Sequence, residues 1–322
     1  MQLTVISSYF GRVPPYFQLW LDSVGTNAHL HWIFYTDCEL SSFSIPENMK
    51  VVLSSFNQMR DRLRRMLGYE PNYHCAWDIC KFKVVFGTVF ADVLKDADYW
   101  AWTDCDMIYG DLAMATRFCF EGFDKILPKG HFSLIRNDKR IADAIAFDSK
   151  VKSILEDGDL VSNSGCLDEE ELRFELLPKL GATQQNDVPY VNFYPRHGHF
   201  QLQDALPLCR KLGYSENPIP GLKLPCVFTW KDGKLVGWFA MPNGQVHKEE
   251  CVYIHFFKRD LTTFPNRLDS GKAYLIIPNR MDEYDGHELT WKEISRLDRW
   301  RVHWRYYAKR MNMKTILRKL GV

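Results

Sequence analysis

Two aspartates one residue apart are the side chains of this chain best placed to do chemistry. Asp104 and Asp106 follow the apolar segment Tyr99–Thr103 (YWAWT), which predicts a buried strand that ends in two carboxylates. In extended chain the side chains at positions i and i+2 point the same way, so both carboxylates can bind one hard cation. Mg²⁺ and Mn²⁺ prefer such oxygen ligands and also bind substrate phosphates, and as Lewis acids they stabilise a departing nucleotide diphosphate. The alternative is a solvated turn after a strand.

The elements upstream of this pair alternate between strand and helix patterns. Apolar runs predict strands over residues 2–10, 29–36, 50–54 and 99–103. Helical spacing predicts helices over residues 16–24, 57–67 and 79–94. This alternation predicts an α/β fold with a mostly parallel sheet covered by helices. Because ligands of such sheets bind beyond the C-terminal strand ends, the polar residues at these ends should converge on one edge.

The pattern is less regular after residue 111. Strands are predicted over residues 129–137, 222–228, 235–241 and 250–257, and helices over 140–155, 169–177 and from 290 onward. Asp232-Gly233 lies between two of these strands and predicts a hairpin turn.

Five segments, in this order, resemble those of known glycosyltransferases: CKFKVVFG (80–87), DYWAWTDCDMIYGDL (98–112), GHFSLIRN (130–137), LDEEEL (167–172) and YIHFFKRD (253–260). An opening strand with a D-x-D near residue 105 resembles the GT-A glycosyltransferases. The ordered series is similar to a family of bacterial glycosyltransferase-like proteins found with capsule and O-antigen gene sets. The likeness covers about residues 1–260, although the stretch from Lys83 to Gly87 lacks the Pro and Tyr of that family's pattern.

The resemblance implies a GT-A-like α/β fold, a single Rossmann-like mixed sheet flanked by helices, with a C-terminal helical extension. We therefore expect a catalytic domain over residues 1–285 and a basic, aromatic helical extension over residues 286–322.

The resemblance also implies roles for individual residues. Asp104 and Asp106 would contact Mn²⁺ or Mg²⁺ and the nucleotide sugar, and His255 resembles a histidine that completes the metal shell in several GT-A enzymes. Lys83 and Lys258 would neutralise phosphates of the donor. From the residues alone, the alternatives are a half-buried strand histidine, a helix-surface lysine and a solvated strand end.

Four further residues lie at or near predicted strand ends, where a uridine or a similar base and its ribose would bind: Ser7, Tyr9, Thr36 and Asp37. The carboxylate of Asp37 can accept hydrogen bonds from such groups. The alternative for these residues is structural capping of turns.

Two acidic residues, Asp168 and Glu169, are the candidate general base. A transfer that inverts the anomeric centre needs a base to take the acceptor hydroxyl proton, and these residues match an Asp-Glu pair of the resembled family. The alternative is ordinary acidity at a helix N-terminus, where negative charge is favourable.

Composition and charge exclude several classes of protein. Hydrophobic residues make up 46% of the 322, which excludes wholesale disorder, and the net charge of +1 gives no support for a nucleic-acid partner. The nine cysteines form no C-x-x-C pair, which favours reduced thiols over a zinc cluster. Neither a signal-peptide pattern nor a run of 18 apolar residues occurs, so we expect a cytoplasmic protein.

The C-terminal segment is rich in basic and aromatic residues. Ten Lys or Arg residues lie between Lys292 and Lys319, interleaved with tryptophans and tyrosines. Such a helix can lie on an anionic membrane surface, which suits peripheral contact with the cytoplasmic face of the inner membrane and a lipid-linked acceptor. The alternative is a helix that packs its aromatic face on the catalytic domain.

These observations predict a metal-dependent glycosyltransferase. It would move a sugar from a nucleotide-diphosphate sugar, with UDP as the expected nucleotide, to a glycan acceptor in a growing bacterial surface polysaccharide, capsule or O-antigen. Two alternatives are a metal-dependent nucleotidyltransferase and a catalytically silent glycan-binding or scaffold subunit on the same fold. The first would need a Gly-rich basic N-terminal loop, and Ser7–Pro15 offers one Gly and one Arg.

Overall fold

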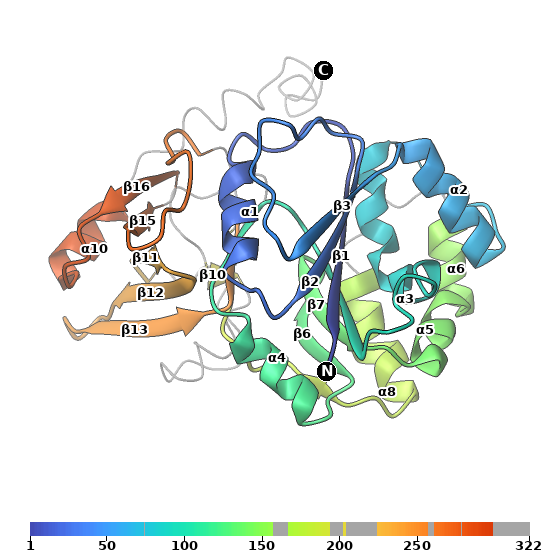
Figure 1. Cartoon of the computed structure of the whole chain (residues 1–322). Helices are drawn as coiled ribbons and strands as arrows, with labels where there is room; N and C mark the ends of the chain where they lie inside the picture. The colour runs from blue at the N-terminus through green and yellow to red at the C-terminus, as the bar shows by residue number, and fades with distance from the viewer. Residues whose placement is uncertain are drawn as a thin grey trace, which may run out of the picture. The chain divides into compact units, whose positions relative to one another are not determined.

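The computed structural model describes residues 1–73, 75–156, 167–193, 202–203, 224–256, 261–277 and 279–298. They belong to two compact units (Figure 1). The N-terminal unit contains residues 1–105 and 112–188, and the C-terminal unit contains residues 106–111 and those from 189 onward. The chain therefore enters the C-terminal unit for a short stretch immediately after Cys105. The expected domain boundary between residues 285 and 286 stays a prediction.

A seven-stranded mixed sheet forms the centre of the N-terminal unit, in the order β3-β2-β1-β4-β7-β6-β8. Its strands are β1 (Leu3–Tyr9), β2 (His31–Thr36), β3 (Met49–Leu53), β4 (Tyr99–Thr103), β6 (Lys125–Lys129), β7 (Phe132–Arg136) and β8 (Gln184–Gln185). The first four strands are mutually parallel, and β7 runs antiparallel to both β4 and β6. The predicted α/β fold class, with a mixed sheet flanked by helices, is confirmed.

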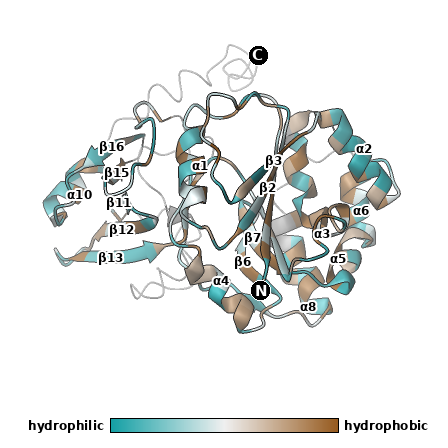
Figure 2. Cartoon of the chain, viewed as in Figure 1, coloured by the Kyte–Doolittle hydropathy of each residue, from teal (hydrophilic) through white to brown (hydrophobic). Residues whose placement is uncertain are grey.

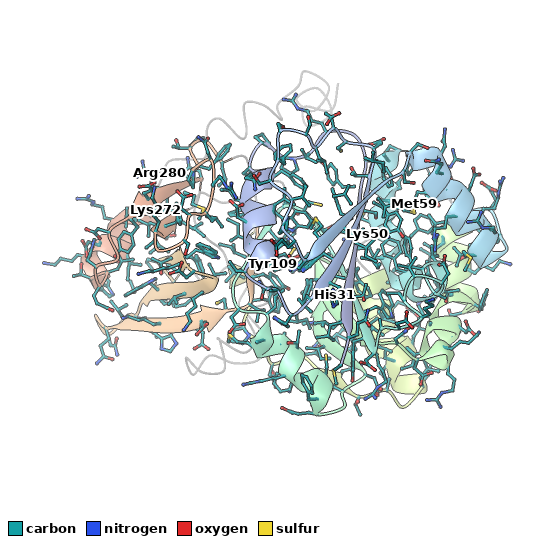
Figure 3. The ribbon with its side chains drawn as sticks, in the orientation of Figure 1. His31, Lys50, Met59, Tyr109, Lys272 and Arg280 are labelled. Carbon is teal, nitrogen blue, oxygen red and sulfur yellow. The ribbon has the colours of Figure 1, made fainter. Side chains whose placement is uncertain are left out.

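Helices cover both faces of this sheet (Figure 1). They are α1 (Phe17–Gly25), α2 (Phe56–Leu67), η1 (Ala76–Val85), α3 (Phe86–Val89), α4 (Ala113–Phe120), α5 (Lys139–Ala146), α6 (Ser149–Glu156), η2 (Leu167–Leu176) and α8 (Leu177–Lys179). Successive side chains of β2 point to opposite faces of the sheet. Trp32 and Phe34 contact aromatic rings of α1 on one face, and Tyr35 is buried in the core that includes residues of α2 and α3 on the other. Met59 of α2, labelled in Figure 3, is buried in that core.

Local signals explain where α2 begins and ends. Ser55 and Gln58 form a reciprocal capping box at its N-terminus. Each side chain accepts a hydrogen bond from the backbone N–H of the other residue, and these N–H groups have no acceptor within the helix. Gly68 ends it in the left-handed conformation, with φ of 74°. Residues 57–67 were predicted as this helix, and the prediction is confirmed.

Two predicted elements of the N-terminal unit are present with different limits. The strand predicted over residues 129–137 is β7, the second half of a hairpin, and it begins only after Gly130 and His131, which join β6 to β7. The helix predicted over residues 140–155 is two helices. Asp148 accepts hydrogen bonds from the backbone N–H groups of Lys150 and Val151 at 2.9 and 3.1 Å, so it caps a new helix, α6.

The helix predicted over residues 79–94 is also only partly correct. The segment is a 3₁₀ helix, η1, followed by the single turn α3. Ile79, Phe82 and Val85 are buried at a spacing of three residues, which is the period of a 3₁₀ helix.

The C-terminal unit contains two sheets. The smaller has the order β10-β9-β14-β5, and the larger is antiparallel with the order β13-β12-β11-β15-β16. Their strands are β5 (Met107–Tyr109), β9 (Val191–Phe193), β10 (Leu202–Gln203), β11 (Cys226–Lys231), β12 (Lys234–Ala240), β13 (Val246–Cys251), β14 (Tyr253–His255), β15 (Ala273–Ile277) and β16 (Arg280–Tyr284). The single strand predicted over residues 250–257 is therefore the end of β13 followed by β14, because the chain leaves one sheet after Cys251 and joins the other at Tyr253.

The sequence of the larger sheet explains its hairpin turn and its hydrophilic edge strand. Asp232 and Gly233 join β11 to β12 with φ of 47° and 81°, the conformation of the hairpin turn that Asp-Gly predicted. The edge strand β13 is largely hydrophilic (Figure 2), which discourages pairing with other chains. On the β15–β16 hairpin, Lys272 and Arg280 (Figure 3) form ion pairs with neighbouring carboxylates.

One helix, α10 (Trp291–Leu297), packs on this sheet through Ile294, against a cluster that includes Val227 and Trp238. The extension predicted from residue 286 is thus described only as far as residue 298. Within the described part of the chain, every helix is too short or too polar to span a bilayer.

Gly110 lies at the end of β5, where other segments of its unit approach closely. A Cβ atom there would lie 2.3 Å from the carbonyl oxygen of Cys251 and 2.9 Å from Cβ of Leu235. The backbone N–H of Gly110 also donates to the carbonyl of Val252 at 2.9 Å. The position therefore admits only glycine without movement of the backbone.

We expect Gly110→Ala to lower the free energy of unfolding by about 2–3 kcal/mol, because the added methyl forces β5 away from β14. Chemical denaturation measures this loss. Gly244→Ala is the control, because Gly244 has φ of 83° with nothing within 4 Å of an added Cβ. That variant should lose only about 1 kcal/mol. Equal losses in the two variants would contradict the steric explanation.

Candidate metal centre

The first candidate ligand, Asp104, is positioned by the central strand of the N-terminal unit. β4 lies between β1 and β7, and the backbone N–H of Asp104 donates to the carbonyl of His131 at 3.0 Å. The parallel pairing of β1 with β4 brings Ser7 opposite Thr103, and the parallel pairing of β1 with β2 brings Tyr9 opposite Thr36. The C-terminal ends of these strands therefore meet at one edge, as predicted.

The second candidate ligand, Asp106, begins the excursion into the C-terminal unit. β5 follows it and pairs antiparallel with β14, so that Met107 lies opposite His255. The backbone N–H of Phe256 donates to the carbonyl of Asp106 at 2.9 Å. This pairing brings Nε2 of His255 to 3.3 Å from Oδ1 of Asp106, although the two residues are far apart in sequence.

A third residue, Asn192, contacts the same histidine. β9 and β14 are parallel, with Asn192 opposite His255, and Nδ1 of the imidazole lies 2.9 Å from Oδ1 of Asn192. Both side chains are buried. Sequence reasoning missed Asn192, since a lone asparagine in a three-residue strand carries no recognisable pattern.

Asp104, Asp106 and His255 together offer a set of metal-binding atoms. One ligand atom of each lies within 4.8 Å of those of the other two. The aspartates are partly exposed, with side-chain accessibilities of 31% and 20%, while the histidine is buried. The two predicted carboxylates and the predicted histidine are thus brought together.

The donor set fits Mn²⁺ or Mg²⁺. Metal–oxygen distances of about 2.1 Å place neighbouring ligand atoms about 3 Å apart and opposite ones about 4 Å apart, so side chains within 4.8 Å need little movement. Carboxylate oxygens suit both ions, and a neutral imidazole is an acceptable further ligand for Mn²⁺.

Lys83, predicted to bind a donor phosphate, lies against Asp104. Its side chain is buried on η1, forms an ion pair with Oδ1 of Asp104 and donates to the carbonyl of Gly130 at 3.2 Å. The indole N–H of Trp102 donates to the same carbonyl at 2.8 Å. The ammonium group therefore stands beside the carboxylate at which a cation would bind.

The four residues predicted to bind the nucleotide base and ribose form hydrogen bonds with other residues of the N-terminal unit. Ser7 and Thr36 are buried; Oγ of Ser7 lies 3.4 Å from the carbonyl of Thr103, and Oγ1 of Thr36 accepts from the N–H of Cys38 at 3.0 Å. The other two hold the loop after β1: Asp37 accepts from the N–H of Gly11 at 2.8 Å, and the hydroxyl of Tyr9 donates to the carbonyl of Arg12 at 2.9 Å.

Cys38 also contacts this loop, since its thiol donates to the carbonyl of Gly11 at 2.9 Å. Burial raises the pKa of the thiol, and the charge of Asp37 raises it further against the opposing hydrogen bond from Thr36. The thiol consequently stays protonated at neutral pH and keeps its donor role.

The remaining predicted residues are described in part or lie outside the described residues. Asp168 and Glu169 lie in the first turn of η2, but the described structure does not include their side chains. Lys258 lies outside the described residues, as does the basic segment from residue 299 onward.

Comparison with known sequences assigns the chain to a family. Residues 5–285 match the family described as "Family of unknown function (DUF6625)". The chain belongs to this family. The family description gives no activity, so the likeness of the DUF6625 protein to capsule and O-antigen proteins stays a prediction.

No curated protein sequence matches the DUF6625 chain. Among solved structures it is similar to apo mouse xyloside xylosyltransferase 1, with 11% identity, a TM-score of 0.39, and coverage of 60% of this chain and 87% of that one. It is also similar to a glycosyltransferase involved in the glycosylation of the major capsid of PBCV-1, with 11% identity, a TM-score of 0.33, and coverage of 60% and 85%. Likenesses this distant assign no activity to the DUF6625 protein.

We expect Lys83→Met to bind Mn²⁺ about tenfold more tightly in the absence of nucleotide, because it removes a positive charge that repels the ion and competes for Asp104. Calorimetric titration of the apoprotein with MnCl₂ measures the change.

The matched control is Lys81→Met, in the same helix. Lys81 is also buried and pairs with a carboxylate, that of Asp78 at 2.7 Å, instead of Asp104. Its loss should reduce stability and leave the Mn²⁺ affinity unchanged. An unchanged or weaker Mn²⁺ affinity in Lys83→Met would show that the ammonium does not compete with the ion.

Proposed function

We propose that this protein is a metal-dependent glycosyltransferase that uses a nucleotide-diphosphate sugar, with UDP as the nucleotide. The observation that carries the proposal is the group Asp104, Asp106 and His255, whose ligand atoms lie within 4.8 Å of one another. Asp104 directly follows a buried parallel strand, the position at which α/β sheets bind their ligands. Carboxylates with an imidazole form a site for a hard cation, and such a cation binds diphosphates.

In this proposal the three side chains hold the ion, which when bound supplies Lewis acidity to the leaving diphosphate. Asp106 and His255 are fixed by the β5–β14 pairing, and Asp104 by β4. Lys83 contributes positive charge next to Asp104, where it can stabilise negative charge that develops on the phosphate oxygens. Its burial holds the ammonium in place, so little reorganisation is needed during the reaction.

Asp168 and Glu169 are the proposed general base. They begin η2, and a carboxylate at that position could accept the proton of an acceptor hydroxyl. The proposal for these two residues rests on their match to an Asp-Glu pair in the resembled family. It applies if the transfer inverts the anomeric centre.

The proposed acceptor is a lipid-linked glycan of a bacterial surface polysaccharide. The proposal draws on the capsule and O-antigen resemblance and on the basic, aromatic C-terminal segment, which suits the cytoplasmic face of an anionic membrane. Vesicle flotation with anionic lipids tests the membrane part separately from the chemistry.

The alternative function is a catalytically silent glycan-binding or scaffold protein. One observation favours it: Lys83 already forms an ion pair with Asp104, so this carboxylate has a cationic partner without a metal. The two functions differ in whether a nucleotide binds only with metal.

We expect UDP to bind the wild-type protein only with Mn²⁺ or Mg²⁺, and chelation with EDTA to abolish this binding. Asp106→Asn should weaken metal-dependent UDP binding at least about 100-fold, because an amide is a poor ligand for a hard cation. Calorimetry with UDP, GDP, CMP and ADP, with and without metal, measures both effects.

Asp96→Asn is the control, since Asp96 is an exposed aspartate of the N-terminal unit and should leave binding unchanged. If no nucleotide binds wild-type protein under any metal condition, the glycosyltransferase proposal is lost, and the glycan-binding function becomes the better account.

A further inference from the structure

The imidazole of His255 has a close polar neighbour on its Nδ1 side. Its Nδ1 lies 2.9 Å from Oδ1 of Asn192. An amide oxygen carries no proton, so Nδ1 must be the donor. In the neutral ring this places the proton on Nδ1 and the lone pair on Nε2.

That lone pair faces a second acceptor. Nε2 lies 3.3 Å from Oδ1 of Asp106. Two acceptors at this distance repel unless a proton or a cation lies between them. Metal-binding histidines generally donate their other ring N–H to an oxygen, which fixes the tautomer and the orientation of the ring.

From this geometry we infer that Asn192 is a positioning residue that holds His255 in the tautomer required for metal binding. The inference deepens the proposed function and rests on it. Asn192 does not contact the ion; it acts through the imidazole.

The strands make this arrangement rigid. Asn192 and His255 are directly opposite in the parallel β9–β14 pair, with Val191 opposite Ile254 at the preceding position. The backbone N–H of Val252 donates to the carbonyl of Pro189 at 2.8 Å, which extends the same pairing. Because both side chains are buried, water cannot easily replace the amide as the partner of Nδ1.

The test compares substitutions of Asn192 in the 322-residue chain. Asn192→Leu keeps the approximate size and removes the acceptor, so the apparent Kd for Mn²⁺ should rise about 10–100-fold. Asn192→Asp restores an oxygen acceptor and should bind Mn²⁺ at least as tightly as the wild type. Calorimetric titration with MnCl₂ measures the affinities.

A second readout separates positioning from a merely structural role. In ¹⁵N-histidine-labelled protein saturated with diamagnetic Mg²⁺, the ring nitrogens of His255 should show the Nδ1–H tautomer in the wild type, assigned by comparison with His255→Gln. Asn192→Leu should shift the ring toward Nε2–H, and Asn192→Asp should not.

Asn279→Leu is the matched control. Asn279 is a buried asparagine of the same unit, and its amide donates to Oγ1 of Thr262 at 2.9 Å instead of contacting a histidine. Its substitution should lower the Tm without changing the Mn²⁺ affinity. Equal losses of Mn²⁺ affinity in Asn279→Leu and Asn192→Leu would overturn the inference.

Two further variants distinguish failure of this inference from failure of the proposed metal centre. If Asp106→Asn and His255→Ala lose Mn²⁺ binding while Asn192→Leu binds like the wild type with an unchanged tautomer, the positioning role is overturned and the metal centre stands. If Asp106→Asn and His255→Ala bind Mn²⁺ as the wild type does, the metal centre itself is overturned, and the inference with it.

Discussion

The pairing of β5 with β14 is the constraint on which the candidate site depends. Three residues that directly follow Asp106 form a strand with Tyr253–His255, and the backbone of Asp106 accepts from Phe256 at 2.9 Å. Backbone hydrogen bonds in a ladder fix the register, so the distance between the carboxylate and the imidazole follows from the strand geometry. The close approach of Gly110 to Cys251 explains how so short a strand is held in place.

Charge balance is the second feature that shapes the site. Two carboxylates separated by one residue would repel each other, and Lys83 offsets part of that repulsion through its ion pair with Asp104. The imidazole of His255, whose Nδ1 lies 2.9 Å from Oδ1 of Asn192, adds a ring nitrogen beside the carboxylates. The carboxylate pair and Lys83 together therefore carry less negative charge than the two aspartates alone. In the proposed function, this reduced charge would favour binding of metal and nucleotide together over binding of metal alone.

Much of the fold followed from local patterns, and the errors have a common cause. β4 was predicted with its observed limits, because an uninterrupted apolar run before two aspartates has no competing interpretation. The Asp232-Gly233 turn was equally clear. Element limits were wrong where a turn or a change of sheet lies inside one predicted element, as at Gly130, Asp148 and Val252. Periodicity reports which residues are buried, but it does not report where the chain changes direction or joins another sheet.

The sequence by itself determined the chemistry available to this protein: two carboxylates at the end of a buried strand, a downstream histidine and an α/β alternation. These properties are local, because they depend on side-chain type and on spacing along the chain. Only the tertiary structure decided which residues surround the carboxylates. It brought His255 to Asp106, placed Asn192 behind the histidine, and directed Lys83 to Asp104. Such contacts depend on strand pairing between segments far apart in sequence, and that pairing is set by the packing of the whole unit, which no local pattern encodes.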